Sequence, residues 1–223
     1  MKKTIGFITI GQSPRTDIME DVREIIPSDI DIIEAGALDN YSFEYIKENL
    51  SPGISDQFLV SRMRDGSQVE IAEEKIHGLL QNCVDDLNAK GCSIILMMCT
   101  GSIPEFTSNV PVLPPQKILH NIIKNIGFKK KIGVYVPEKE QEEKIKNVWN
   151  SLGLDIKPVF ASPYRGLHDI KKEAEKLCSD DISIIFMDCM GYSEKMKEAV
   201  QEITGKPVII PRMMIVKVAL ELI

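Results

Sequence analysis

Short apolar runs alternate with amphipathic stretches along this chain, and the alternation predicts strands separated by helices. Apolar runs bounded by turn residues are typical of buried strands, whereas apolar residues three and four positions apart are typical of helices. We expect strands over residues 4–10, 31–35, 131–136, 156–160 and 207–210. We expect helices over residues 14–26, 69–90, 115–126, 138–152, 167–178 and 193–204, with a further helix at the end. This order predicts βαβ units and parallel sheets.

Two further apolar runs, residues 93–101 and 183–191, read almost alike. Six of their nine aligned positions are identical, namely Ser, Ile, Ile, Met, Cys and Gly. Each run places a cysteine at the end of an expected strand, with glycine two residues later. Ligands bind outside the carboxyl ends of strands in open α/β sheets. The pattern therefore predicts that Cys99 and Cys189 line a binding site.

A fainter repeat accompanies the cysteine runs and indicates a duplicated fold. Ile5-Gly6 at the first strand resembles Ile132-Gly133. From Ile5 to the start of its cysteine strand at Ile94 is 89 residues, against 52 from Ile132 to Ile184, a difference of about 37. We place these extra residues within 38–66, which is rich in turn-forming and polar residues. A segment of that length favours a lid or an interface, and a solvated surface loop is the alternative.

Composition narrows the function classes. The 223 residues are 43% hydrophobic and 27% charged, with a net charge of −6, which disfavours nucleic acid as a partner. No apolar stretch approaches the length of a membrane span. The chain has five cysteines, an odd number, which disfavours a disulfide framework and indicates a cytoplasmic protein. No two cysteines form a CxxC pair and the three histidines are scattered, so a metal site is not expected.

The paired cysteines suggest proton-transfer chemistry. The N–H groups and helix dipole that follow such a strand lower a thiol pKa from about 8.5 toward neutrality. A thiolate on one face of a substrate and a thiol on the other would move an α-proton through a planar carbanion. The alternative is that each cysteine is a small buried hydrophobe. We interpret Cys83, Cys92 and Cys178 as core or surface residues.

The first strand leads into residues 11–17, which have the features of an anion site. Gly11 permits the turn, Ser13 is a candidate helix cap, and Pro14 suits the first helical position. Exposed N–H groups with Arg15 and Thr16 would hold a carboxylate or phosphate. The alternative is a well-capped helix with a solvated arginine.

Other polar residues are weaker candidates. Arg62, next to Arg64 in a compact loop, would close over an anionic ligand or pair with nearby acids. The hydroxyl of Tyr164 would line the site, unless residues 162–164 form a plain turn. Asp188 points away from Cys189 on its strand and is interpreted as a structural hydrogen-bond acceptor. No chemistry is assigned to the histidines.

Four motifs together resemble the AroM family. They are Thr-Ile-Gly-Gln-Ser-Pro-Arg at 9–15, Arg-Met-Arg-Asp-Gly at 62–66, Cys-Thr-Gly at 99–101 and Asp-Cys-Met-Gly at 188–191. The resemblance covers essentially the whole chain. It implies membership of the aspartate/glutamate/hydantoin racemase superfamily, with two pseudo-symmetric α/β lobes of parallel sheet flanked by helices. The lobes would comprise residues 1–115 with 206–223, and residues 116–205, with a cleft between them.

The chain keeps the superfamily's two cysteine turns but changes their neighbours. Thr100-Gly101 stands where Asn-Thr is usual, and Met190 replaces the Thr of the second turn. Gln12-Ser13 replaces an acidic residue, and some AroM relatives have serine in place of Cys99. Superfamily members with one cysteine act as decarboxylases or isomerases.

These features predict a cofactor-independent racemase or isomerase that acts on a small carboxylate. Cys99 and Cys189 would form the acid/base pair, without a metal. The predicted backbone donors to the substrate are those of Thr100, Gly101, Met190 and Gly191. Two alternatives stay open: a one-cysteine decarboxylase or isomerase, and a non-catalytic carboxylate-binding regulator linked to aromatic amino-acid metabolism. A homodimer is a further expectation.

Overall fold

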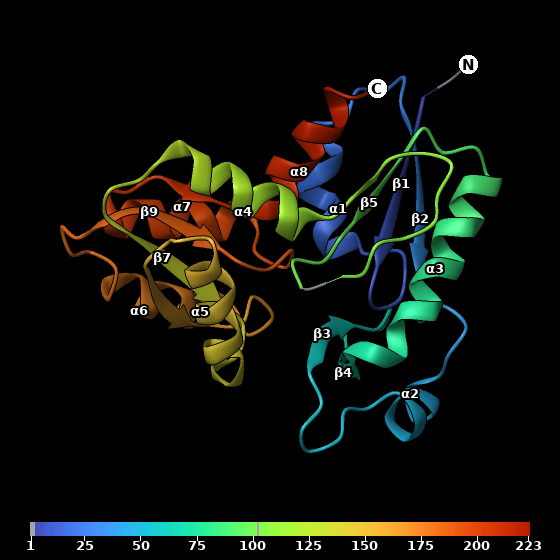
Figure 1. Ribbon diagram of the computed structural model, residues 1–223, viewed down its shortest axis with the longest axis horizontal. Coiled ribbons are helices and arrows are strands. Elements are labelled where there is room, and N and C mark those ends of the chain that lie inside the picture. The colour runs from blue at the N-terminus through green and yellow to red at the C-terminus, as the bar shows by residue number, and fades with distance from the viewer. Residues whose placement is uncertain (1–2, 102) are drawn as a thin grey trace. The chain divides into compact units, whose positions relative to one another are not determined.

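The computed structural model describes residues 3–101 and 103–223, which fold into two compact units (Figure 1). Unit 1 comprises Met1–Pro114 with Val216–Ile223, and unit 2 comprises Pro115–Ile215. Within the described ranges, no helix has the length and apolar composition needed to cross a bilayer.

Unit 1 contains a four-stranded parallel sheet in the order β2-β1-β5-β6. Its strands are β1 (Thr4–Thr9), β2 (Asp31–Gly36), β5 (Ile94–Met97) and β6 (Val112–Leu113). Helices α1 (Thr16–Arg23) and α3 (Glu73–Ala89) lie on opposite sides of these strands (Figure 1). All four residues of β5 are buried, as expected of a central strand covered on both faces.

Unit 2 repeats this arrangement with a parallel sheet in the order β10-β9-β7-β8. Its strands are β7 (Lys131–Val136), β8 (Ile156–Phe160), β9 (Ile182–Met187) and β10 (Val208–Ile209). The helical elements are α4 (Pro115–Ile126), η1 (Lys139–Gln141), α5 (Glu142–Ser151), α6 (Leu167–Glu175), α7 (Glu194–Thr204) and α8 (Pro211–Leu220). The last of these, α8, begins in unit 2 and ends in unit 1.

The two sheets match strand for strand, with β1 and β5 corresponding to β7 and β9. Ile5 pairs with Ile94 in unit 1, and Ile132 pairs with Ile184 in unit 2. The same four isoleucines mark the two spacings, 89 and 52 residues, that were compared in the sequence. The repeat therefore reflects equivalent register positions in two sheets of the same order.

The extra residues of unit 1 form a small subdomain instead of an irregular loop. It contains α2 (Phe43–Asn49) and an antiparallel hairpin of β3 (Phe58–Arg62) and β4 (Gln68–Ala72). The helix expected over 69–90 is therefore wrong at its start, since it begins at Glu73. Val69 and Ile71 are buried because they alternate with polar neighbours along a strand, where they pair with β3.

Two further expectations need correction. The helix expected over 14–26 spans only Thr16–Arg23, and Ser13 does not cap it, because the Ser13 hydroxyl binds Asp39 instead. The two-residue strand β6 was missed, because a run that short carries no period-2 signal.

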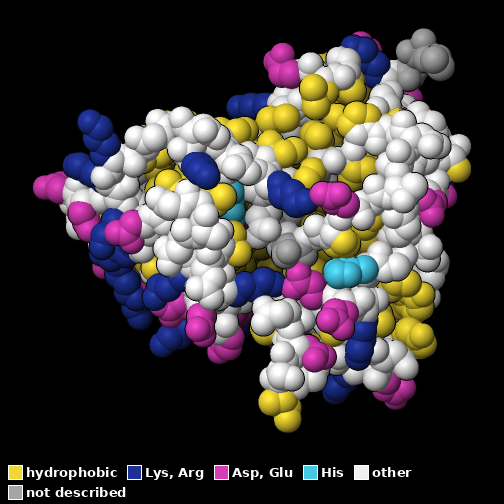
Figure 2. Space-filling view, in the orientation of Figure 1, with side chains coloured by type: hydrophobic (Ala, Val, Ile, Leu, Met, Phe, Trp, Pro, Cys, Tyr) yellow, Lys and Arg dark blue, Asp and Glu magenta, His cyan; other side chains and the backbone are white. Residues whose placement is uncertain are grey.

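The surface mixes charge and apolar residues. On the face in Figure 2, basic and acidic side chains are interspersed, with hydrophobic side chains between them. Three of the exposed large hydrophobic residues lie in the subdomain of unit 1, namely Phe43, Tyr45 and Ile54. Tyr45 stacks on Tyr41 with ring centroids 4.9 Å apart, which orders part of this surface.

Candidate active site

Each cysteine run delivers its thiol just beyond the end of a central strand. The backbone ladder continues one residue past each strand, where Met98 donates to the carbonyl of Ile8 at 2.7 Å and Asp188 donates to that of Tyr135 at 2.9 Å. Cys99 follows Met98 and Cys189 follows Asp188, and both cysteines are partly exposed. In each unit the thiol thus lies at the carboxyl end of the sheet, where α/β folds bind ligands.

The two thiols have the same backbone partner in their own units. The N–H of Gly101 donates to Sγ of Cys99 at 3.3 Å, and the N–H of Gly191 donates to Sγ of Cys189 at 3.4 Å. A hydrogen bond that a sulfur accepts is stronger when the sulfur is a thiolate. The same N–H···S contact is therefore present in both turns.

Side chains approach both glycines closely, and these side chains differ between the two turns. A methyl group on Gly101 would lie 2.5 Å from Cδ2 of Leu59. A methyl group on Gly191 would lie 2.7 Å from Cγ of Pro163 and 2.9 Å from the hydroxyl of Tyr164. The Cys99 turn is thus covered by an apolar side chain, whereas the phenol of Tyr164 lies against the Cys189 turn.

The middle residues of the turns, Thr100 and Met190, are both buried. Tyr192 follows the second turn, and its hydroxyl donates to the carbonyl of Ala161 at 2.8 Å. Burial, with the nearby Cys189, raises the pKa of Tyr192 well above 10, so its phenol stays neutral and acts as a structural donor. The binding roles expected for the turn residues and Tyr164 stay predictions.

The predicted anion site at residues 11–17 is engaged by carboxylates of unit 1. Asp39 accepts from both the backbone N–H of Ser13 at 2.6 Å and its hydroxyl at 2.7 Å. The side chain of Arg64 donates to the carbonyl of Ser13 at 2.6 Å and to Asp39 at 3.1 Å. The side-chain oxygen of Gln12 accepts from the N–H of Arg64 at 3.0 Å. These contacts fasten the first turn to the loop between β3 and β4.

Arg15 is buried and makes a two-pronged contact with Asp17, with both N···O distances 2.8 Å. Its third nitrogen donates to the hydroxyls of Thr9 at 3.2 Å and Ser61 at 3.4 Å. Arg15 therefore joins β1, α1 and β3, which is a structural role that the sequence did not indicate. Binding of an anion by Ser13 or Arg15 stays a prediction.

The remaining candidates of this region lie at its surface. Thr16 is exposed at the start of α1. Arg62 donates to the carbonyl of Gly66 at 3.1 Å and lies 3.8 Å from the carboxylate of Asp17. Pairing with nearby acids, one of the two roles considered for Arg62, is thus present in the structure.

The Arg15–Asp17 pair predicts a pH-dependent stability. Burial raises the pKa of Asp17, but hydrogen bonds from Arg15 and the charges of Arg15 and Arg62 lower it more, so the pKa lies below 3.8. The pair stabilises the folded protein above pH 3.8, and this contribution is lost as the pH falls through the lowered pKa. We expect Asp17→Asn to reduce the free energy of unfolding at pH 7 by about 1–2 kcal/mol.

Urea unfolding of both proteins between pH 2.5 and 7 measures this effect. The difference between wild type and Asp17→Asn is expected to shrink below pH 3.8 and then vanish. Glu20→Gln, at an exposed position of the same helix, is the matched control and is expected to leave the free energy of unfolding unchanged. A difference that persists undiminished at pH 2.5 contradicts the ion-pair explanation.

Asp188 is an acceptor in a buried polar network of unit 2, as its strand position predicted. The indole N–H of Trp149 donates to Oδ2 of Asp188 at 3.1 Å, and Nε2 of His120 lies 3.2 Å from the same oxygen. The rings of His120 and Trp149 are 4.1 Å apart between centroids. His120 was assigned no chemistry, because 68 residues separate it from Asp188 and no local spacing connects them. The network fixes the residue that directly precedes Cys189.

Two other cysteines have raised thiol pKa values, in agreement with their interpretation as core or surface residues. Burial raises the pKa of the Cys83 thiol to about 12, and Asp39 and Asp86 add to the shift. Burial also raises the pKa of Cys92. Cys178 is exposed and lies outside both cysteine turns, which are residues 99–101 and 189–191. In the described part of the chain, no three His, Cys, Asp or Glu side chains converge as metal ligands would.

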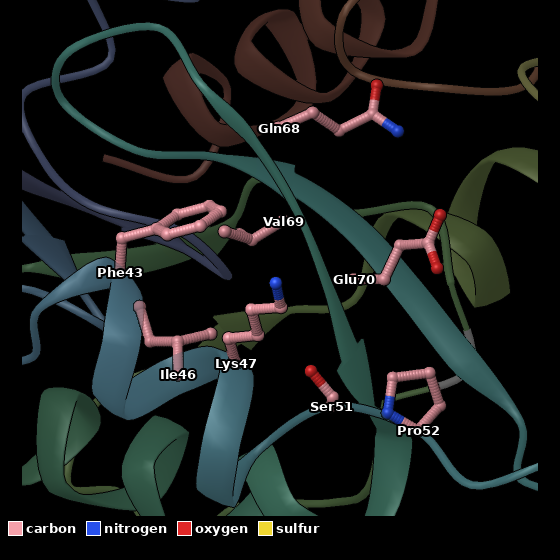
Figure 3. Close-up of a pocket in the computed structure, with 8 residues that line it drawn as sticks. All are labelled: Phe43, Ile46, Lys47, Ser51, Pro52, Gln68, Val69 and Glu70. Atoms are coloured by element: carbon pink, nitrogen blue, oxygen red, sulfur yellow. The ribbon is translucent and has the colours of Figure 1, made fainter.

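A groove of about 330 Å³ lies in unit 1 between α2 and β4 (Figure 3). Phe43, Ile46 and Val69 gather at one end, and Ser51, Pro52 and Glu70 lie at the other (Figure 3). None of the predicted site residues lines this groove. It therefore has no part in the chemistry considered for the thiols.

Comparison with known proteins supports the resemblance found in the sequence. The family model described as AroM protein matches residues 5–223. Among curated proteins, no sequence matches significantly.

Several solved structures share this fold at low sequence identity. Allantoin racemase from Pseudomonas fluorescens has a TM-score of 0.66 at 13% identity, covering 98% of this chain and 90% of its own. The maleate isomerase Iso from Pseudomonas putida has a TM-score of 0.67 at 13% identity, covering 98% and 92%. Glutamate racemase from Francisella tularensis, in complex with D-glutamate, has a TM-score of 0.62 at 14% identity, covering 99% and 81%. The expected α/β fold of the Asp/Glu racemase type is confirmed.

Proposed function

The chain belongs to the AroM protein family, and from this premise we propose that it is a cofactor-independent racemase or isomerase acting on a small carboxylate. The observation that carries the proposal is the matched pair of thiol turns. Each unit places one sulfur at the carboxyl end of its central strand and gives it a backbone N–H partner. The named activities of the structural neighbours, racemases and an isomerase, support the same class of reaction.

The proposed two-base reaction requires that both sulfurs reach the same α-carbon from opposite faces. The thiolate of one cysteine takes the α-proton, and the electron pair of the C–H bond moves into the carboxylate to form a planar enediolate. The thiol of the other cysteine then gives its proton to the opposite face. One proton has been taken and one returned, so the substrate keeps its composition and inverts its configuration. The first sulfur ends as a thiol and the second as a thiolate.

The polar groups around the turns have supporting roles in this proposal. Backbone N–H groups of residues 100–101 and 190–191 would stabilise the enediolate charge as it develops. The hydroxyl of Tyr164, which packs against Gly191, would donate to the carboxylate. Ser13 and Arg15 already bind the side chains of Asp39 and Asp17. We therefore propose that the substrate carboxylate binds at the thiol turns instead.

Thiol reactivity tests the proposal within one molecule. We expect iodoacetamide at pH 7 to alkylate Cys189 faster than the exposed Cys178, which serves as the internal control. Mass spectrometry of peptides after timed quenching gives the rate at each site. Alkylation of both Cys99 and Cys189 at or below the rate of Cys178 contradicts activated thiols and favours a non-catalytic binding protein.

Isotope exchange then separates the reactions. A racemase or isomerase of this type incorporates deuterium at the α-carbon of its substrate in D₂O and leaves the carboxylate in place. A one-cysteine decarboxylase, the alternative enzyme, releases carbon dioxide and delivers one deuteron irreversibly. Proton NMR of a panel of 2-substituted carboxylates distinguishes the two outcomes.

A further inference from the structure

The hairpin of unit 1 brings an apolar side chain to the Cys99 turn. A methyl group on Gly101 would lie 2.5 Å from Cδ2 of Leu59 and 3.3 Å from Sγ of Cys99. Both atoms are therefore close to one point, on the same side of the turn. A group bound beside the Cys99 sulfur meets the methyl of Leu59.

The surroundings of this contact are also apolar. Leu59 belongs to the buried hydrophobic cluster of unit 1 together with Met63 and Ile103, and Cys99 and Phe106 pack against that cluster. At the corresponding glycine of unit 2, a methyl group would lie 2.7 Å from Cγ of Pro163 and 2.9 Å from the hydroxyl of Tyr164. The two turns thus share the N–H···S contact but differ in their neighbours, because only the unit 2 turn has a hydroxyl among the three nearest atoms.

Leu59 is held firmly in this position. It pairs with Ile71 in the β3–β4 ladder and is only 5% exposed. The hairpin itself is tied to the first turn, where the N–H of Gln12 donates to the carbonyl of Arg62 at 3.1 Å. A side chain with so little freedom selects the shape and polarity of a neighbouring group.

From this difference we infer that Leu59 determines specificity and that the substrate is a carboxylate with an apolar substituent on the α-carbon. The inference rests on the proposed function, in which the substrate lies against the Cys99 sulfur. Its apolar substituent is placed against Leu59, within unit 1. A hydrophobic contact of this kind discriminates between substituents by roughly 10–200-fold.

Protection of Cys99 from iodoacetamide tests the inference with acetate, phenylacetate and succinate as probes. In the wild-type protein, phenylacetate is expected to halve the alkylation rate at a concentration at least tenfold lower than acetate does. Succinate, whose second carboxylate would meet the Leu59 methyl, is expected to protect no better than acetate.

Two variants assign the preference to Leu59. Leu59→Thr places a β-branched residue, which suits a strand, at this position and brings a hydroxyl beside the Cys99 turn. The ratio of the acetate and phenylacetate concentrations that halve the alkylation rate is therefore expected to fall below about threefold. Leu59→Met conserves volume and apolar character and is expected to keep the ratio. Circular dichroism melts establish that both variants are folded. If Leu59→Thr does not fold, the inference is still tested by the wild-type concentration ratio and by the protection that succinate gives.

The possible failures are distinct. Equal protection by acetate and phenylacetate, better protection by succinate, or an unchanged ratio in folded Leu59→Thr overturns the inference and leaves the proposed function standing. Failure of every carboxylate to protect either Cys99 or Cys189 overturns the proposed function itself, and the inference with it.

Discussion

Cys189→Ala is expected to lower the rate of α-hydrogen exchange by about 10²–10⁴-fold, which is the usual contribution of one acid/base group. The variant removes the sulfur that accepts the N–H of Gly191 but keeps the backbone turn, since alanine suits the same conformation. The loss is therefore expected in kcat, without a comparable change in stability. Proton NMR in D₂O on the substrate found by the carboxylate panel measures it.

Two further variants complete the comparison. Cys178→Ala, at an exposed cysteine outside both turns, is expected to exchange at the wild-type rate. Cys99→Ala separates the mechanisms, because a two-base reaction needs both sulfurs, whereas a one-base reaction would continue without Cys99. Full turnover by Cys189→Ala would show that the mechanism is wrong.

Gly11→Ala is expected to destabilise unit 1 by about 3 kcal/mol, at the upper end of the usual cost of overpacking. The added methyl would lie 2.1 Å from the carbonyl oxygen of Arg62 and 2.7 Å from the hydroxyl of Ser61. The nearest of these atoms is backbone, so no side-chain rotation relieves the clash. The hairpin has to move, and the hydrogen bond from Gln12 to Arg62 is expected to break.

A matched glycine in the same unit provides the control. Gly78 lies on α3, and a methyl there would meet nothing within 4 Å. Gly78→Ala is therefore expected to stabilise the protein by about 0.5–1 kcal/mol, because alanine favours the helix. Urea unfolding compares the two variants. Equal stability of Gly11→Ala and wild type would contradict the close approach of the first turn to β3.

The equivalent strands of the two units could be predicted well, because the same residues recur at matching positions in both. Ile94 and Ile184 head runs with shared apolar positions, and buried central strands tolerate little else. The cysteine turns followed from the same repeat. Their backbone N–H···S geometry is local, since it joins residues only two positions apart.

Contacts between distant positions were not predictable in the same way. The hairpin was hidden because the alternation of Val69 and Ile71 runs without a break into the apolar spacing of α3. Arg15 had the composition of an anion binder, and only the fold brings Asp17, Thr9 and Ser61 around it. Charge type is readable from a sequence, whereas the choice of partner depends on tertiary structure. The homodimer and the cytoplasmic location stay predictions.

The hydrogen bond from glycine to sulfur has a consequence for how this protein can vary. The donor is a main-chain amide, which every residue except proline supplies, so replacing Thr100 or Met190 does not remove it. Residues 100 and 190, within the limits that their burial sets, can thus change without loss of the N–H···S contact. Proline at position 101 or 191 is the single exchange that would delete the donor outright. Exchanges at these positions therefore leave the orientation of the sulfurs to the main chain, which is the part of the turn that they do not alter.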